Sequence, residues 1–160
     1  TPIQLADTAF NITTFGEDEQ GELYLADYAT GKIYQLTSTI FEDVPWDYWA
    51  WDYIERLYKA GVTSGCSSSP LLYCPMNTVT RDQMAVFLLK AKHGPNYIPP
   101  KAIGVFEDVP VTYWAADWIE QLAKEGVTAG CSVTPSLYCP GTPVSRDQMA
   151  VFLVRNFNLP

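Results

Sequence analysis

The first forty residues alternate apolar and polar side chains with a period of two, which is the pattern of β-strands. Residues 10–15, 22–27 and 33–36 each carry this alternation, and polar turns that contain glycine separate them. The pattern predicts an antiparallel meander of about three strands within residues 1–40. A sheet of this size rarely stands alone, so we expect it to pack on the rest of the chain or on another molecule.

After residue 40 the apolar positions follow the period of a helix. Ala50, Ile54 and Leu57 lie at i, i+4 and i+7, on one face of a helix that we expect over residues 48–59. Gly61 follows the last turn, where helices commonly end in a left-handed glycine.

A second helix is predicted to begin after Thr80. Thr80 caps this helix and Gln83, at the third helical position, reaches back to the backbone, which together make a capping box. An apolar stripe follows, and we expect it in the core: Met84, Phe87, Leu88 and Ala91, with Met149, Phe152 and Leu153 as later counterparts.

The helix–loop–helix pattern is written twice. Residues 41–91 return as residues 106–156 at a constant offset of 65, and 33 of the 51 aligned positions are identical. This is an internal duplication, so the function must suit a repeated module. The segment between the copies contains Gly-Pro and Pro-Pro and indicates a stiff, irregular linker. The expected organisation is an α+β chain with a β-meander at 1–40, a helical repeat at 41–91, a linker at 92–105 and a second helical repeat at 106–160.

The composition narrows the class of protein. With 48% hydrophobic and 18% charged residues among 160, the chain is expected to be globular. A net charge of −8 argues against nucleic acid and against an anionic membrane surface as partners. No apolar run is long enough to span a membrane. The chain begins at Thr1 and not at Met, so we expect it to be processed or trimmed.

Four cysteines fall at equivalent places, Cys66 and Cys74 in the first copy and Cys131 and Cys139 in the second. Four cysteines allow three pairings, and the duplication favours one disulfide within each copy. Closing so short a loop stabilises by roughly 2–3 kcal/mol in the chain-entropy model. The alternative is zinc, which usually needs Cys-x-x-Cys spacing or added histidines, and His93 is the single histidine. Disulfides indicate an oxidising compartment: the periplasm, the cell surface or the cell exterior.

The arginines that open the second helix of each copy are the first candidates for ligand contact. Arg81 and Arg146 stand where an arginine can meet a carboxylate or phosphate with paired hydrogen bonds. The alternative is an internal tie to Asp82 and Asp147, or to the aspartates of the Phe-Glu-Asp-Val motif. Asp82 and Asp147 are therefore included in the predicted ligand site.

Tryptophans extend the predicted site. Trp49 and Trp114 recur in both copies beside an alanine of the core face, so we expect them in the core. Trp46 and Trp51 are not repeated, and an exposed tryptophan suits stacking on a sugar ring. Trp46 and Trp51 complete the predicted ligand-binding set.

No catalytic constellation is evident in the sequence. His93 lies in the Gly/Pro linker without a repeated nucleophile, and the carboxylate pair Glu42 and Asp43 is expected to cap a helix. The acidic turn at 17–19 is a conceivable Ca²⁺ site, but its spacing favours a solvated turn. We therefore expect this chain to have no enzyme activity, no cofactor and no metal.

The duplicated segment resembles the S-layer homology domain. The resemblance rests on Phe-Glu-Asp-Val, Trp-Ala, Gly-Val-Thr and Arg-Asp-Gln-Met-Ala, in the same order and spacing in both copies. It implies a non-catalytic module that anchors an exported protein to cell-wall polysaccharide, often a pyruvylated polymer, through grooves between repeats. The family usually has three repeats and opens the second helix with Thr-Arg-Ala-Glu. This sequence contains two repeats and reads Thr-Arg-Asp-Gln in the first.

The first forty residues resemble the last strands of the β-propeller in secreted sugar dehydrogenases of the glucose/sorbosone type. Ile-Thr-Thr-Phe-Gly-Glu-Asp at 12–18, Gly-Glu-Leu-Tyr at 21–24 and Gly-Lys-Ile-Tyr-Gln-Leu at 31–36 carry this resemblance. It implies that the chain is the tail of a longer enzyme whose catalytic residues, quinone site and calcium site lie elsewhere.

Together these features predict an anchoring module at the bacterial cell envelope, with wall polysaccharide as its partner. One alternative is the C-terminal fragment of a quinone-dependent sugar dehydrogenase. Another is a self-assembling extracellular protein of an S-layer or filament, joined by strand addition at the edges of the meander.

Overall fold

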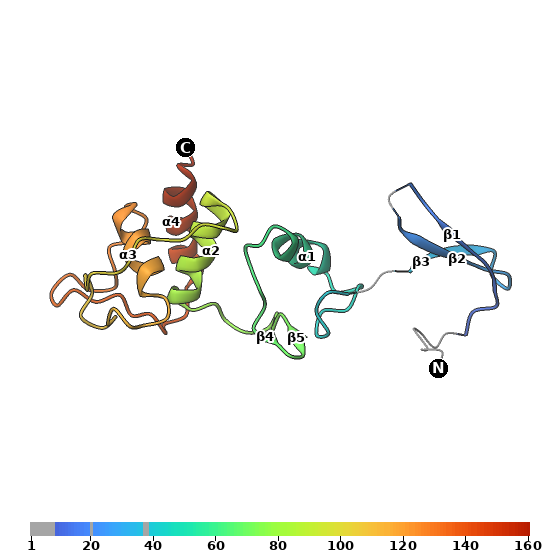
Figure 1. Ribbon diagram of the computed structural model, residues 1–160, viewed down its shortest axis with the longest axis horizontal. Coiled ribbons are helices and arrows are strands. Elements are labelled where there is room, and N and C mark those ends of the chain that lie inside the picture. The colour runs from blue at the N-terminus through green and yellow to red at the C-terminus, as the bar shows by residue number, and fades with distance from the viewer. Residues whose placement is uncertain (1–8, 20, 37–38) are drawn as a thin grey trace.

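The computed structural model describes residues 9–19, 21–36 and 39–160 (Figure 1). A three-stranded antiparallel sheet precedes four helices, which confirms the predicted α+β class. The elements are β1 (Ile12–Glu17), β2 (Leu23–Asp27), β3 (Lys32–Leu36), α1 (Trp51–Lys59), β4 (Ser67–Ser68), β5 (Leu71–Leu72), α2 (Arg81–His93), α3 (Ala116–Lys124) and α4 (Arg146–Phe157).

The sheet has the order β1-β2-β3, and the side chain of Asp27 fixes its turns. The Asp27 carboxylate accepts hydrogen bonds from the Asn11 amide at 3.0 Å and the Thr30 hydroxyl at 2.7 Å. The bond from Thr30 holds the pKa of Asp27 below its ordinary value.

Among the described residues, the three strands contact no helix (Figure 1). The expectation that the sheet packs on the helical repeats is therefore wrong for these strands. Phe15 and Ile33 remain 62% and 74% exposed, so the sheet has no cover for much of its apolar surface. Packing on another molecule stays a prediction, and residues 1–8 of the predicted meander lie outside the described residues.

Each helical copy is held together by the aspartate of its Phe-Glu-Asp-Val motif. The Asp43 carboxylate accepts from the backbone amides of Tyr73 and Cys74 at 2.8 and 2.7 Å. Asp108 makes the same two bonds with Tyr138 and Cys139 at the same distances. The motif thereby ties the start of each copy to the end of its cysteine loop.

Both predicted disulfides are present, Cys66–Cys74 and Cys131–Cys139, which contradicts the zinc alternative. The predicted capping box of Thr80 and Gln83 is also confirmed, and Ser145 and Gln148 form its counterpart in the second copy. Gln83 accepts from the Thr80 amide at 3.2 Å, and Gln148 accepts from the Ser145 amide at 3.4 Å. Because such local signals depend on neighbouring residues alone, they could be predicted from sequence.

The larger core crosses the boundary between the copies. Helix α2 of the first copy packs against α3 and α4 of the second, while α1 packs against no other described helix (Figure 1). Leu88 and Leu89 of α2 share one cluster with Ile119 and Leu122 of α3. The first copy keeps a small cluster of its own, built on Phe41, Val44 and Ile54.

This arrangement buries the predicted apolar stripe unequally in the two copies. Met84 and Leu88 are buried as expected, whereas Leu153, the counterpart of Leu88, is 39% exposed. Ala91 is exposed, so the stripe ends before it. The second copy packs on the stripe of α2, whereas no further repeat packs on the stripe of α4 among the described residues.

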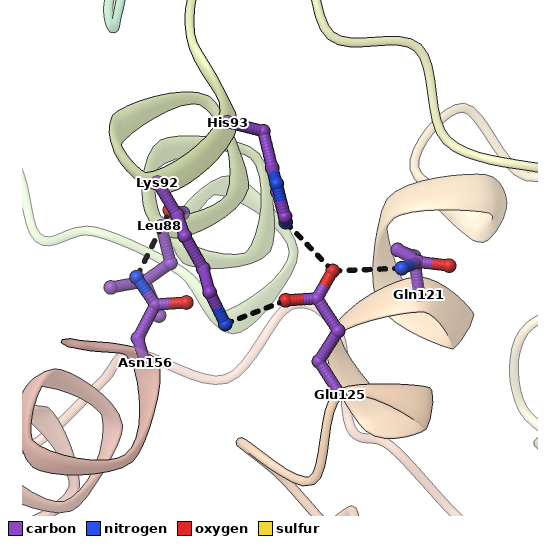
Figure 2. A network of polar contacts seen from close by, with 6 residues as sticks. All are labelled: Leu88, Lys92, His93, Gln121, Glu125 and Asn156. Carbon is purple, nitrogen blue, oxygen red and sulfur yellow. Dashed lines mark hydrogen bonds and ion pairs between the residues drawn. The ribbon is translucent and has the colours of Figure 1, made fainter. Parts of the chain in front are cut away.

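A polar network closes the contact between α2 and α3 (Figure 2). The Glu125 carboxylate accepts from Lys92 at 2.9 Å and from Gln121 at 2.7 Å, and lies 2.8 Å from His93 Nε2. Burial opposes ionisation of Glu125, but the bonds from Lys92, Gln121 and His93 outweigh it and hold its pKa below the ordinary value.

Candidate ligand-binding grooves

Two equivalent grooves lie beside the second helix of each copy. The first groove, about 410 Å³, lies between loop residues 62–66, 73–75 and 77–79 and the α2 side chains Gln83 and Lys90. The second groove, about 290 Å³, lies between loop residues 127–130 and the α4 side chains Gln148 and Arg155. Most residues that line the second groove lie 65 positions after a residue that lines the first, so the two grooves are related by the duplication.

Residues from both copies line the first groove. Trp114 of the second copy is 60% exposed and lines this groove together with Phe87 and Lys90 of α2. An indole face, an amide from Gln83 and an ammonium group surround one partly polar hollow. Aromatic faces suit the apolar side of a sugar ring, and the cation suits an acidic substituent.

The second groove receives Arg81 from the first copy. Arg81 is only 4% exposed, and its Nε donates to the Tyr138 carbonyl at 2.9 Å. Its guanidinium lies 4.8 Å from the centre of the Tyr138 ring and 5.4 Å from that of Phe152. Burial raises the pKa of the Tyr138 hydroxyl, which stays protonated and donates to the Arg81 carbonyl at 2.8 Å.

Arg81 is thus held by contacts within the chain, but its partners are not the aspartates that the sequence indicated. The described residues contain no ion pair between Arg81 and a carboxylate. Its partners are a backbone carbonyl and the Thr128 hydroxyl, 3.4 Å from a terminal nitrogen. A contact between Arg81 and a ligand stays a prediction.

The structure separates the other predicted site residues. Asp147 lines the second groove with Arg81, and the Ser145 hydroxyl holds the pKa of Asp147 below its ordinary value. Asp82 is buried and accepts from the Tyr113 hydroxyl at 2.6 Å. Arg146 is exposed at the start of α4, and among the described residues its side chain has no hydrogen bond or ion pair.

The two unrepeated tryptophans lie outside both grooves. Trp46 is 67% exposed, and Trp51 is half-buried with its indole N–H donating to Glu55 at 2.9 Å. Neither tryptophan belongs to the lining of a groove. Their binding of a sugar stays a prediction.

The expectation that Trp49 and Trp114 lie in the core is wrong, because they are 82% and 60% exposed. Each precedes its helix, which begins two residues later, so the helical period does not apply to it. Sequence reasoning thereby missed Trp114 as a groove residue. Lys90 and Arg155 occupy equivalent positions in the two copies. This equivalence was the signal in the sequence that could have identified the cations of the two grooves.

The acidic turn at 17–19 has an internal explanation. Asp18 accepts from the Glu22 amide at 2.9 Å and from the Tyr24 hydroxyl at 3.0 Å. These bonds hold the Asp18 carboxylate within the turn between β1 and β2.

Comparison with known families supports one of the two resemblances. The family described as the S-layer homology domain matches residues 40–67, which span α1 and the start of the first cysteine loop. No curated protein matches the chain. The match and the two disulfides indicate an extracellular or cell-surface protein. Among the described residues, no helix has the length and apolar character needed to cross a membrane.

Proposed function

We propose that this chain is a non-catalytic module that anchors an exported protein to the bacterial cell envelope by binding wall polysaccharide. The first groove carries the proposal, because it joins an exposed indole, an amide and a cation at the junction of the two copies. The family match at residues 40–67 supports the same function. We further propose that residues 41–91 and 106–160 are both S-layer homology repeats, joined by residues 92–105.

Charge supports an acidic polymer as the ligand. The chain has a net charge of −8, so an anion must find local positive charge. Lys90 in the first groove and Arg155 in the second provide it at equivalent positions. Of the two predicted arginines, Arg146 is the accessible one and joins the proposed site together with Asp147.

Retention on isolated wall sacculi tests this function. We expect Trp114→Ala and Lys90→Ala each to weaken retention about tenfold, which corresponds to about 1.4 kcal/mol. Removal of the secondary polymer from the sacculi should abolish retention of the unchanged protein.

Trp46→Ala is the matched control, since Trp46 is as exposed as Trp114 but lines neither groove. Circular dichroism establishes that each variant is folded. If Trp46→Ala loses retention and Trp114→Ala keeps it, the site lies at Trp46 and the groove assignment is wrong.

The uncovered sheet favours a second candidate. Strands β1 and β3 are open edges, and their apolar side chains are exposed. Such a sheet suits the end of a β-propeller, as in a quinone-dependent sugar dehydrogenase, or strand addition between extracellular subunits. A quinone-dependent sugar oxidation assay on the product of the full-length coding sequence tests the first possibility. Fibres seen by electron microscopy would support the second.

A further inference from the structure

The joint between the two copies is built from a donor surface on α2 and an acceptor surface on the second copy. The Arg81 amide donates to the Thr142 carbonyl at 3.0 Å, and the Asp82 amide donates to the Pro140 carbonyl at 3.1 Å. The Arg81 side chain enters the second copy beside Tyr138, as described above. Apolar residues of α2 continue the contact onto α3.

Both halves of this joint occur a second time, on α4 and on the first copy, where no repeat packs on them among the described residues. Arg146 and Asp147 on α4 repeat the donor pair Arg81 and Asp82. The first copy repeats the acceptor side chains: Thr63 for Thr128, Tyr73 for Tyr138, Pro75 for Pro140, Tyr48 for Tyr113 and Leu57 for Leu122.

Exposure separates the used surfaces from the unused ones. Leu88 and Leu122, which belong to the buried cluster of the joint, are 3% and 0% exposed. Their counterparts Leu153 and Leu57 are 39% and 41% exposed. The same side chains are thus buried where a neighbouring copy exists and open where none is present.

One pair of contacting residues differs between the joint and the two open surfaces, and the difference favours a match between α4 and the first copy. In the internal joint, Lys92 of α2 meets Glu125 of the second copy (Figure 2). Phe157 stands at the position equivalent to Lys92, and Ala60 stands at the position equivalent to Glu125. Phe157 and Ala60 are both apolar, so they replace the two partners of the ion pair together. A contact between these two positions would therefore bury no unpaired charge.

We propose that a second copy of this chain docks head to tail, with α4 of one molecule on the first repeat of the next, and reproduces the internal joint. Arg146 then enters the neighbour's first groove beside Thr63 and Tyr73, as Arg81 enters the second groove. Trp49 of the neighbour reaches the second groove, as Trp114 reaches the first. In this arrangement the neighbouring molecule completes the second groove.

Such an interface joins different surfaces of identical molecules. Repetition produces a ring if the rotation between copies closes, and an open filament if it does not. Trp51 and Tyr58 stand where the second copy has Ala116 and Ala123, so the new interface presents more aromatic surface than the internal one. This inference does not depend on polysaccharide binding, and its test uses no polysaccharide.

Sedimentation velocity of the full chain, from micromolar to millimolar concentration, tests the proposal. We expect the unchanged protein to associate with rising concentration. Arg146→Ala disables the donor surface and Leu57→Glu disables the acceptor surface, and each should weaken self-association about tenfold or more. Both positions are exposed in the single molecule, so both variants are expected to fold. Lys124→Ala is the charge-matched control for Arg146→Ala and should associate like the unchanged protein.

Mixing the two variants gives the decisive observation. Arg146→Ala keeps a working acceptor and Leu57→Glu keeps a working donor, so the mixture should form a one-to-one dimer that grows no further. A protein that stays monomeric up to millimolar concentration overturns the proposal. Association that survives in both separate variants also overturns it, because the contact then lies elsewhere, as at the sheet edges.

Discussion

At the scale of single residues, the duplication provides a control for almost every side chain. Arg81 and Arg146 are followed by the same seven residues, yet Arg81 is buried and Arg146 is exposed. The difference comes from the environment, because Arg81 has a following copy to enter. A residue's role in this chain is therefore set by which copy follows it.

Alanine substitutions at these two positions should separate the roles. Arg81→Ala leaves the Tyr138 carbonyl without its buried donor and removes a ring contact, so we expect a loss of about 3 kcal/mol in unfolding free energy. Arg146→Ala should change it by less than about 0.5 kcal/mol in dilute solution. Urea denaturation measures both values. Equal losses would show that burial of Arg81 does not stabilise the fold.

A glycine in the first cysteine loop should be equally sensitive. Gly65 has φ 81°, and an added Cβ would lie 2.3 Å from the Leu72 carbonyl oxygen. Gly65→Ala therefore combines left-handed backbone with a steric clash and should cost about 3 kcal/mol. Gly141→Ala is the matched control, because no atom lies within 4 Å of its Cβ position. Melting temperatures should fall for Gly65→Ala alone, and a similar fall in both variants would contradict this explanation.

Sequence patterns predicted the residues whose role is local and missed those whose role is not. The disulfides and the capping boxes depend on spacing within one copy, and they were predicted. The exposure of Trp49 and Trp114 and the burial of Arg81 depend on where the other copy lies. No periodicity within 50 or so residues contains that information.

At the scale of elements, the contact between α2 and α3 combines apolar packing with one carboxylate. Helical periodicity predicted both helices, but it gave no indication that α2 packs on the second copy and not on α1. Glu125 is central to this contact because three side chains from two helices converge on it (Figure 2).

Glu125→Gln should therefore weaken the joint in a pH-dependent way. The pKa of Glu125 lies below its ordinary value of about 4.5, so its ionised form stabilises the fold above that pH. This contribution is lost as the pH falls through the lowered pKa. We expect the variant to be less stable by about 1 kcal/mol at neutral pH, and the difference to shrink below about pH 4.

Urea denaturation of both proteins at a series of pH values measures this difference. Comparison of the two proteins at each pH removes the effect of the other carboxylates, which titrate in both. Lys124→Ala, which removes a charge from the same helix without touching Glu125, should show no such trend. A difference that stays constant down to pH 2 would contradict the role given to Glu125.

At the scale of the whole molecule, the units of sequence are not the units of folding. The duplication divides the helical part at residues 92–105, but its larger core joins α2 to α3 and α4 across that boundary. The sheet, in contrast, shares no contact with the helices among the described residues. The chain should thus behave as a sheet and a helical body that includes both copies.

Removal of the N-terminal residues tests whether the helices fold without the sheet. A chain of residues 39–160 should keep the unfolding free energy of the helical body within about 0.5 kcal/mol of its value in the full chain, since none of the three described strands contacts a helix. Helical circular dichroism during urea denaturation measures this transition. A large loss of stability would show that the sheet supports the helices after all.

Removal of the C-terminal residues should, in contrast, destabilise the helices that remain. A chain of residues 1–97 keeps the first copy complete in sequence but removes α3 and α4, which cover Leu88 and Leu89 of α2. Burial of each leucine contributes about 2 kcal/mol, and the bonds from Arg81 to the second copy are lost as well. We expect α2 to unfold and the remaining helical signal to melt without a cooperative transition. A cooperative transition close to that of the full chain would show that each copy folds alone, and the head-to-tail joint would then be a contact between finished domains.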